Sequence, residues 1–240
     1  MVSRASIIGL IALSGCVLPY ANSTPQPAVT NGKGKHAFGF RTQVPTANLL
    51  AAGDREGEFS DLPLTPFPIL SIEYSYGLGD ALDVEAGLDS TRFFFVLPVP
   101  TGLWGGLRLN IVNGKKFAAS IAGRLGGIFG LSDDESEENT GGVFSQFTLT
   151  GQMNPYGAIR PGLSVAATPA VVFSGGRSFF AQVYSSTLSV SFTNDSIEVS
   201  PFVDGALIDA QNSSGAEFVF SGGVYFRLRP GKKRQSLTPD

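Results

Sequence analysis

The segment that decides the fold is ILSIEYSYGLGDALDVEAGLD, residues 69–89. In its first half, Leu70, Ile72 and Tyr74 alternate with polar residues, and Val84 and Leu88 do the same in its second half. A period of two places successive side chains on opposite faces of a β-strand. The GLGD between the halves has the glycines and the aspartate of a tight turn. The segment therefore predicts a β-hairpin in which each strand has one apolar and one polar face.

The same alternation recurs along the chain. It predicts about ten strands, at residues 35–44, 67–77, 80–89, 101–112, 116–129, 143–153, 156–166, 179–192, 196–207 and 216–229. Most of them run 9–14 residues, whereas strands of soluble proteins usually have about 5–6 and membrane-spanning strands need about 9–11. With 30 glycines, 19 phenylalanines and 15% charged residues in 240, the composition also favours an all-β protein.

The connections between the predicted strands fall into two classes. GLGD, NGK, NPY and NDS are tight turns, and they alternate with longer joins at 45–66, 90–100, 130–142, 167–178 and 208–215. Outer-membrane barrels have short periplasmic turns, long external loops and an even number of strands. We therefore predict an antiparallel up-and-down transmembrane β-barrel with both termini in the periplasm and the long loops outside. Aromatic residues at the strand ends fit the girdles of such barrels.

The N-terminus has the form of an export signal. Arg4 precedes an apolar run from Ala5 to Leu13, which is too short to span a bilayer. The following Leu13-Ser14-Gly15-Cys16 resembles the lipobox of bacterial lipoproteins. That resemblance implies that residues 1–15 are removed and that Cys16, the only cysteine, carries a covalent lipid in the inner leaflet beside the barrel. Ordinary signal cleavage at the same small residues is the alternative.

The rest of the chain divides into three parts. Residues 16–33 are rich in Pro, Asn, Ser and Thr and are predicted to be a flexible tether. The barrel follows at 34–229, and 230–240 form a basic and polar tail. The closing strand EFVFSGGVYFRLRP resembles the C-terminal insertion signal of outer-membrane proteins, although GKKRQSLTPD follows where a terminal aromatic is usual. The resemblance is to bacterial outer-membrane barrels as a class, and it implies as partners outer-membrane lipid and the machineries for barrel assembly and lipoprotein export.

The polar faces predict a charged lumen. Its expected lining is Arg41, Glu73, Asp83, Glu85, Asp89, Arg108, Arg124, Arg160, Glu198, Asp204, Glu217 and Arg227. Acids and arginines lie on neighbouring strands, and burying them unpaired would be costly, so ion pairs are expected. These pairs either plug a narrow barrel with a structural or surface-exposed role, or line a small passive pore for small solutes. A soluble periplasmic lipoprotein that binds a small ligand is a third possibility.

The scarcity of residues typical of catalytic sites argues against an enzyme. The only histidine, His36, begins the first predicted strand in phase with outward-facing Phe38 and Phe40, and no nucleophile elbow, phosphate loop or metal-ligand motif is present. Apart from the lipid on Cys16, no cofactor or metal is expected. Five acids among residues 133–138 are predicted to form a solvated external loop. The chain carries a net charge of −3, and its only basic cluster is in the tail, so nucleic-acid binding has no support.

Overall fold

The computed structural model describes residues 25–46, 69–90, 92–94, 97–99, 102–129, 141–174, 177–194, 196–210 and 217–230. The barrel strands are β1 (His36–Thr46), β2 (Ile69–Gly77), β3 (Leu82–Ser90), β6 (Gly102–Asn113), β7 (Phe117–Phe129), β8 (Gly141–Met153), β9 (Ile159–Ser174), β10 (Arg177–Thr193), β11 (Ile197–Ala210) and β12 (Glu217–Leu228). Two short strands, β4 (Arg92–Phe94) and β5 (Leu97–Val99), pair only with each other. Within these ranges, no helix has the length and apolar character needed to cross a membrane.

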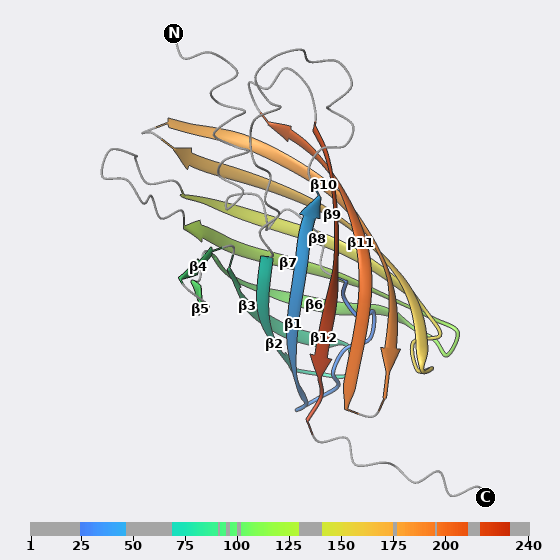
Figure 1. Ribbon diagram of the computed structural model, residues 1–240. Helices are drawn as coiled ribbons and strands as arrows, with labels where there is room; N and C mark the ends of the chain where they lie inside the picture. The colour runs from blue at the N-terminus through green and yellow to red at the C-terminus, as the bar shows by residue number, and fades with distance from the viewer. Residues whose placement is uncertain are drawn as a thin grey trace, which may run out of the picture.

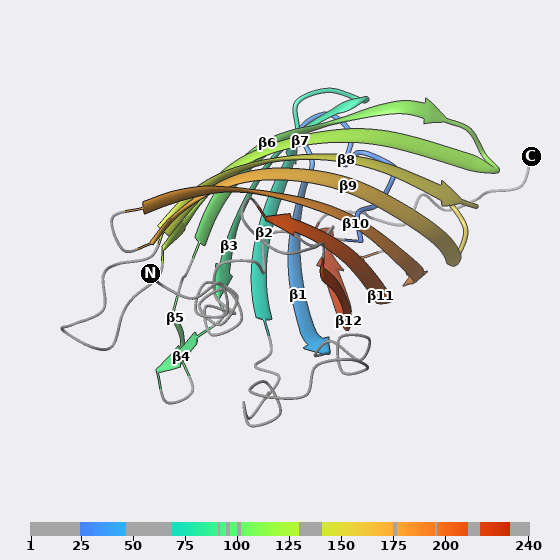
Figure 2. The same ribbon diagram turned by 90° about the horizontal axis from the view of Figure 1, so that it is seen from above.

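The ten long strands close into a single barrel (Figures 1 and 2). Each pairs antiparallel with its neighbours in the chain, and β3 pairs directly with β6. Closure comes from β1 against β12, where Phe38 lies opposite Leu228. The predicted all-β, up-and-down antiparallel barrel of ten strands is confirmed.

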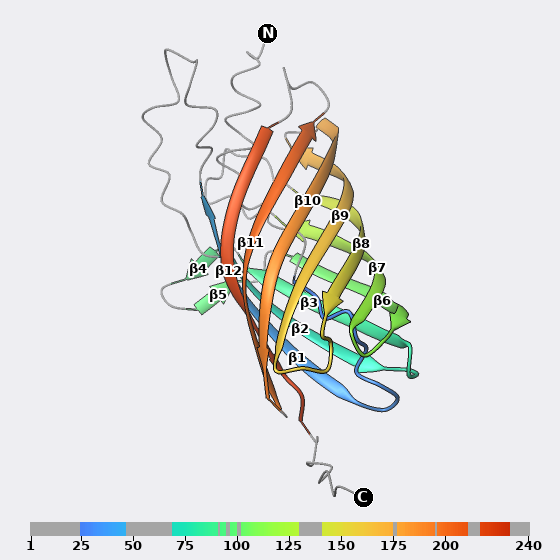
Figure 3. The ribbon, with the colours of Figure 1, turned by 90° about the vertical axis from the view of Figure 1, so that its right-hand side faces the viewer.

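The two ends of the barrel differ. The short connections 78–81, 114–116, 154–158 and 194–196 lie at one end, together with the start of β1 and the end of β12 (Figure 3). We call this the turn end and the opposite end the loop end. In the connection after β8, Asn154 has a φ of 48°, a left-handed conformation that asparagine tolerates better than most residues.

The predicted long connection over 167–178 is wrong. Instead, β9 continues to Ser174 and β10 starts at Arg177, with Thr168 opposite Val183 in an unbroken ladder. The polar–apolar alternation is weak here because several side chains are small, and Pro169 resembles a strand break. The strict alternation of turns with long loops therefore has one exception.

The barrel has a polar inside and an apolar outside. Among the described residues, buried polar and charged side chains outnumber buried apolar ones. On β6, Arg108 is 2% exposed while its neighbour Leu107 is 52% exposed, and Phe147 on β8 is 65% exposed. Leaving such an apolar side chain in water rather than burying it costs about 1.5–3 kcal/mol. This distribution is the inverse of that in a soluble barrel and matches the lipid-facing surface of membrane barrels.

Candidate functional site in the barrel lumen

The chain immediately before β1 lies inside the barrel. We call residues 25–31 the inserted segment. Within it, Ala28 is fully buried, and Pro25, Gln26 and Pro27 are buried as well. A bend joins the segment to β1, and both Gly32 and Gly34 have positive φ values, of 83° and 73°. The expectation of a flexible tether at 16–33 is therefore wrong from residue 25 onward, and residues 16–24 lie outside the described ranges.

The bend is fixed to the barrel wall at the turn end. The backbone N–H of Gly34 donates to the Gly77 carbonyl at 2.8 Å, and the Gly77 N–H donates to the Lys35 carbonyl at 2.9 Å. A side chain at Gly77 would overlap the Gly32 carbonyl. Only glycine at this position lets the bend pack so closely against β2.

Wall side chains bind the backbone of the inserted segment. Arg108 donates to the Pro27 carbonyl at 3.0 Å, and Asn110 donates to the Ala28 carbonyl at 2.5 Å. Carbonyls buried in the lumen need such donors because an unpaired buried acceptor is costly. Both donors are on β6, so one strand holds two successive carbonyls of the segment.

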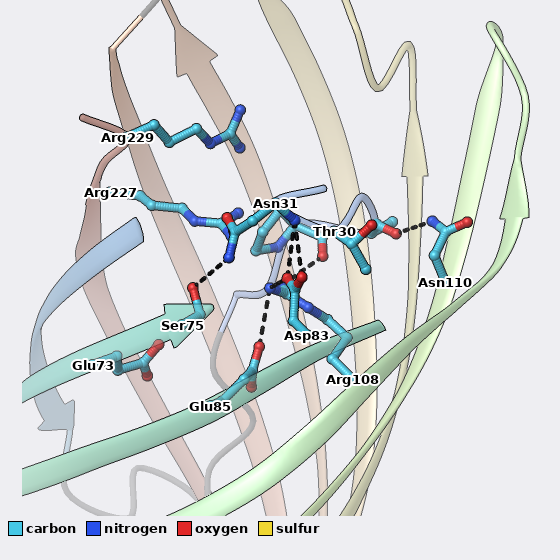
Figure 4. A network of polar contacts seen from close by, with 12 residues as sticks. Thr30, Asn31, Glu73, Ser75, Asp83, Glu85, Arg108, Asn110, Arg227 and Arg229 are labelled. Carbon is cyan, nitrogen blue, oxygen red and sulfur yellow. Dashed lines mark hydrogen bonds and ion pairs between the residues drawn. The ribbon is translucent and has the colours of Figure 1, made fainter. Parts of the chain in front are cut away.

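Asn31 is the most extensively bonded residue of the segment (Figure 4). Its backbone N–H donates to both carboxylate oxygens of Asp83, at 3.1 and 3.0 Å. Its side-chain amide donates to the Ser75 hydroxyl at 2.9 Å and accepts from Arg227 at 2.7 Å. Three strands, β2, β3 and β12, thus converge on one asparagine.

From this asparagine towards the loop end, arginines and carboxylates form a continuous chain. Arg108 pairs with Asp83 at 2.7 Å and with Glu85 at 3.0 Å, and Glu85 also pairs with Arg124 at 3.1 Å. All four side chains are at most 5% exposed. The Arg124 guanidinium also lies 3.9 Å from the ring centroid of Trp104. A buried group of this kind is stable only while its charges stay paired.

The side chain of Gln26 extends this chain into the inserted segment. Its amide faces the Arg124 guanidinium, which makes the amide oxygen the acceptor. Opposite, the Tyr225 hydroxyl donates to Glu73 at 3.3 Å. The pocket between these groups has a volume of about 10 Å³, which is room for roughly one water molecule. On this side of the lumen, the segment and the wall side chains therefore pack closely against each other.

Two further groups of charges lie away from the segment. Towards the turn end, Glu198 pairs with Arg229 at 2.5 Å and with Arg160 at 3.9 Å. Towards the loop end, Arg41 pairs with Asp89 at 3.1 Å. The charges in the lumen are therefore distributed over several levels of the barrel.

Most predicted lining residues are buried in the lumen. They are Arg41, Glu73, Asp83, Glu85, Asp89, Arg108, Arg124, Arg160, Glu198, Asp204 and Arg227. The side chain of Glu217, Cys16 and the acidic stretch 132–142 lie outside what the structure describes, apart from the backbone at 141–142. Whether the buried residues line a pore stays a prediction.

Sequence reasoning missed Gln26, Asn31, Tyr225 and Arg229 as parts of this site. The signal for Asn31 is the Gly32-Lys33-Gly34 that follows it in the chain, because two glycines two residues apart permit the bend that turns the segment inward. Nothing in the sequence indicated Gln26.

His36 lies on the outside of the barrel, as its phase predicted. Its Nδ1 is 2.6 Å from the Tyr74 hydroxyl, and its ring centroid is 5.0 Å from that of Tyr76. In the described part of the chain, no group of three or more His, Cys, Asp or Glu side chains is placed to hold a metal ion. The interpretation as a non-enzyme stays a prediction.

The chain is similar to known proteins in fold only. No protein-family model matches the sequence, and no curated protein matches it. An outer-membrane channel from Pseudomonas putida F1 aligns with a TM-score of 0.46 and 10% identity, over 86% of this chain and 99% of that one. Neisserial surface protein A gives 0.35 and 10%, over 82% and 97%, and the N-terminal barrel domain of Pseudomonas aeruginosa OprF gives 0.32 and 10%, over 82% and 98%. The resemblance to bacterial outer-membrane barrels is one of class.

Proposed function

We propose that this chain is a bacterial outer-membrane barrel whose lumen is closed to solutes, so that its role is structural or surface-exposed rather than transport. The observation that carries the proposal is the close packing around Glu85, Arg108 and Arg124, whose buried ion pairs and the inserted segment border a pocket of only about 10 Å³. On the opposite wall, the lumen-facing side chains of Gln146, Thr148 and Thr150 are buried as well. Hydrated ions and small solutes need far more space than one water molecule occupies.

The apolar outer wall supports a place in the membrane. Exposed side chains such as Leu125, at 70%, and Leu188, at 58%, would bury their area in lipid. By the same proposal, the turn end faces the periplasm, where short connections occur in bacterial barrels. A lipid on Cys16 would add a second anchor, attached by the lipoprotein-export machinery, while the barrel-assembly machinery would insert the strands.

Fractionation and conductance together test the proposal. We expect the native protein and Cys16→Ala both to stay in the outer membrane through carbonate washing, because the barrel alone suffices for insertion. The purified native protein should give no channel steps in planar bilayers. Release of Cys16→Ala as a soluble periplasmic protein would favour the ligand-binding lipoprotein instead, and steady steps from the native protein would favour the small pore.

A further inference from the structure

The inserted segment is bound to the wall without belonging to the sheet. The described strand pairings involve none of residues 25–31, and each barrel strand has its two neighbours without them. The bend at Gly32 and Gly34 joins the segment to β1. The segment therefore occupies the lumen as a ligand occupies a site, and the ladder of ten strands is complete in its absence.

The contacts on the segment are those of a site for extended peptide. Arg108 and Asn110 bind backbone carbonyls, and Asp83 binds a backbone N–H. Pro25 and Pro27 have fixed φ values that favour an extended chain, and they carry no N–H that would need an acceptor in the lumen. The site thus recognises backbone in an extended form.

Side-chain recognition is concentrated at the two ends of the segment. Asn31 is bound through its side chain by Ser75 and Arg227, and Gln26 faces Arg124. The Thr30 hydroxyl also donates to the Asp80 carbonyl at 2.6 Å. The side chains that the wall recognises are therefore a glutamine and, five residues later, an asparagine.

Removing the segment would leave a polar, charged cross-section. Arg108 would keep its carboxylate partners on β3, whereas Asn110, Ser75 and one nitrogen of Arg227 would lose the partners that the segment provides. Water can replace these partners, because polar walls with free donors and acceptors hold water well. A hydrated path would then run through the level that the segment now fills.

We propose that the turn-end half of the lumen is a peptide-binding site, that the chain's own residues 25–31 occupy it, and that the barrel conducts small ions when the site is empty. The proposal rests on the proposed function, since it requires a membrane barrel that its own segment closes. Its occupant in the native protein is the inserted segment, and a free peptide of the same sequence is an equivalent ligand.

The test uses the native chain, a variant without residues 25–31, and the capped peptide PQPAVTN. After refolding, heat-modifiable gel migration and flotation with vesicles establish that each protein is folded and inserted. In planar bilayers we expect the native chain to be silent and the deletion variant to give discrete steps. Peptide added at the turn end should block these steps, and PQPAVTA, which lacks the Asn31 side chain, should need at least a tenfold higher concentration.

The outcomes separate the two proposals. A folded, inserted and silent deletion variant overturns the peptide site and leaves the closed barrel standing. Steps that both peptides block equally, or that neither blocks, also overturn it. Steps from the native chain overturn the closed barrel itself. If the deletion variant does not fold, Asn31→Ala in the full chain replaces it: brief openings that PQPAVTN suppresses support the site, and silence overturns it.

Discussion

Close packing of an indole against a single glycine, Gly87, helps to hold Arg124 in place. A Cβ at Gly87 would overlap the indole of Trp104, and this indole lies under the Arg124 guanidinium. We expect Gly87→Ala to displace the indole and to lower the free energy of unfolding by about 1–3 kcal/mol, the usual cost of overpacking. Urea unfolding in vesicles, followed by the fluorescence of Trp104, the only tryptophan, measures the change.

Gly105→Ala is the matched control for this prediction. A Cβ at Gly105 meets only the Glu85 carbonyl oxygen, at 3.8 Å, which is an ordinary contact. Its free energy of unfolding should stay within about 0.5 kcal/mol of the native value. Equal stability of the two variants would show that the indole can move aside freely, and that its position under Arg124 is not fixed by packing.

At the scale of the strand, the apolar side chains on the outward faces support the proposal that the barrel lies in a membrane. Leu107 lies in the middle of β6 and Val112 near its turn end, with 52% and 44% exposure. In a bilayer, arginine on the lipid face costs about 2–4 kcal/mol at the midplane and about 0–1 near the interface. We therefore expect Leu107→Arg to destabilise the vesicle-bound barrel by that larger amount and Val112→Arg by little, as measured by urea titration of the refolded proteins.

A soluble barrel would respond differently. Both positions would then face water, where surface substitutions usually change stability by less than about 0.5 kcal/mol. Equal and small effects of Leu107→Arg and Val112→Arg would thus contradict the membrane barrel. The comparison needs only one strand, because a β-bulge between Asn110 and Val112 brings Val112 to the same outward face as Leu107, at a different depth.

The strands also show what sequence can and cannot predict. Alternation predicted β2, β3 and β8 closely, because a half-polar, half-apolar wall leaves a period of two in the sequence. It failed at Pro169, where small side chains hide that period. It also missed the inserted segment, whose conformation depends on distant residues: Arg108 is 81 positions from Pro27. A proline-rich stretch without periodicity looks the same whether it is free or bound in a lumen.

At the scale of the whole molecule, the inserted segment is attached at the turn end of the barrel. The bend at Gly32, the end of β12 and the Glu198–Arg229 pair all lie there. The Asn31 end of the proposed peptide site is bonded beside the 78–81 turn at this end, so the orientation of the barrel in the membrane decides which compartment lies nearest to it. If the turn end is periplasmic, as proposed, a competing peptide must come from the periplasm.

Cysteine labelling determines that orientation directly. Lys115 is exposed in the turn between β6 and β7, and Ser178 is exposed near the loop end of β10. In intact cells, a membrane-impermeant maleimide should label Ser178→Cys, whereas Lys115→Cys should react only after the outer membrane is permeabilised. The unsubstituted chain measures any background from Cys16. Labelling of Lys115→Cys alone in intact cells would show that the barrel has the opposite orientation. The turn end, and with it the Asn31 end of the peptide site, would then face the outside of the cell.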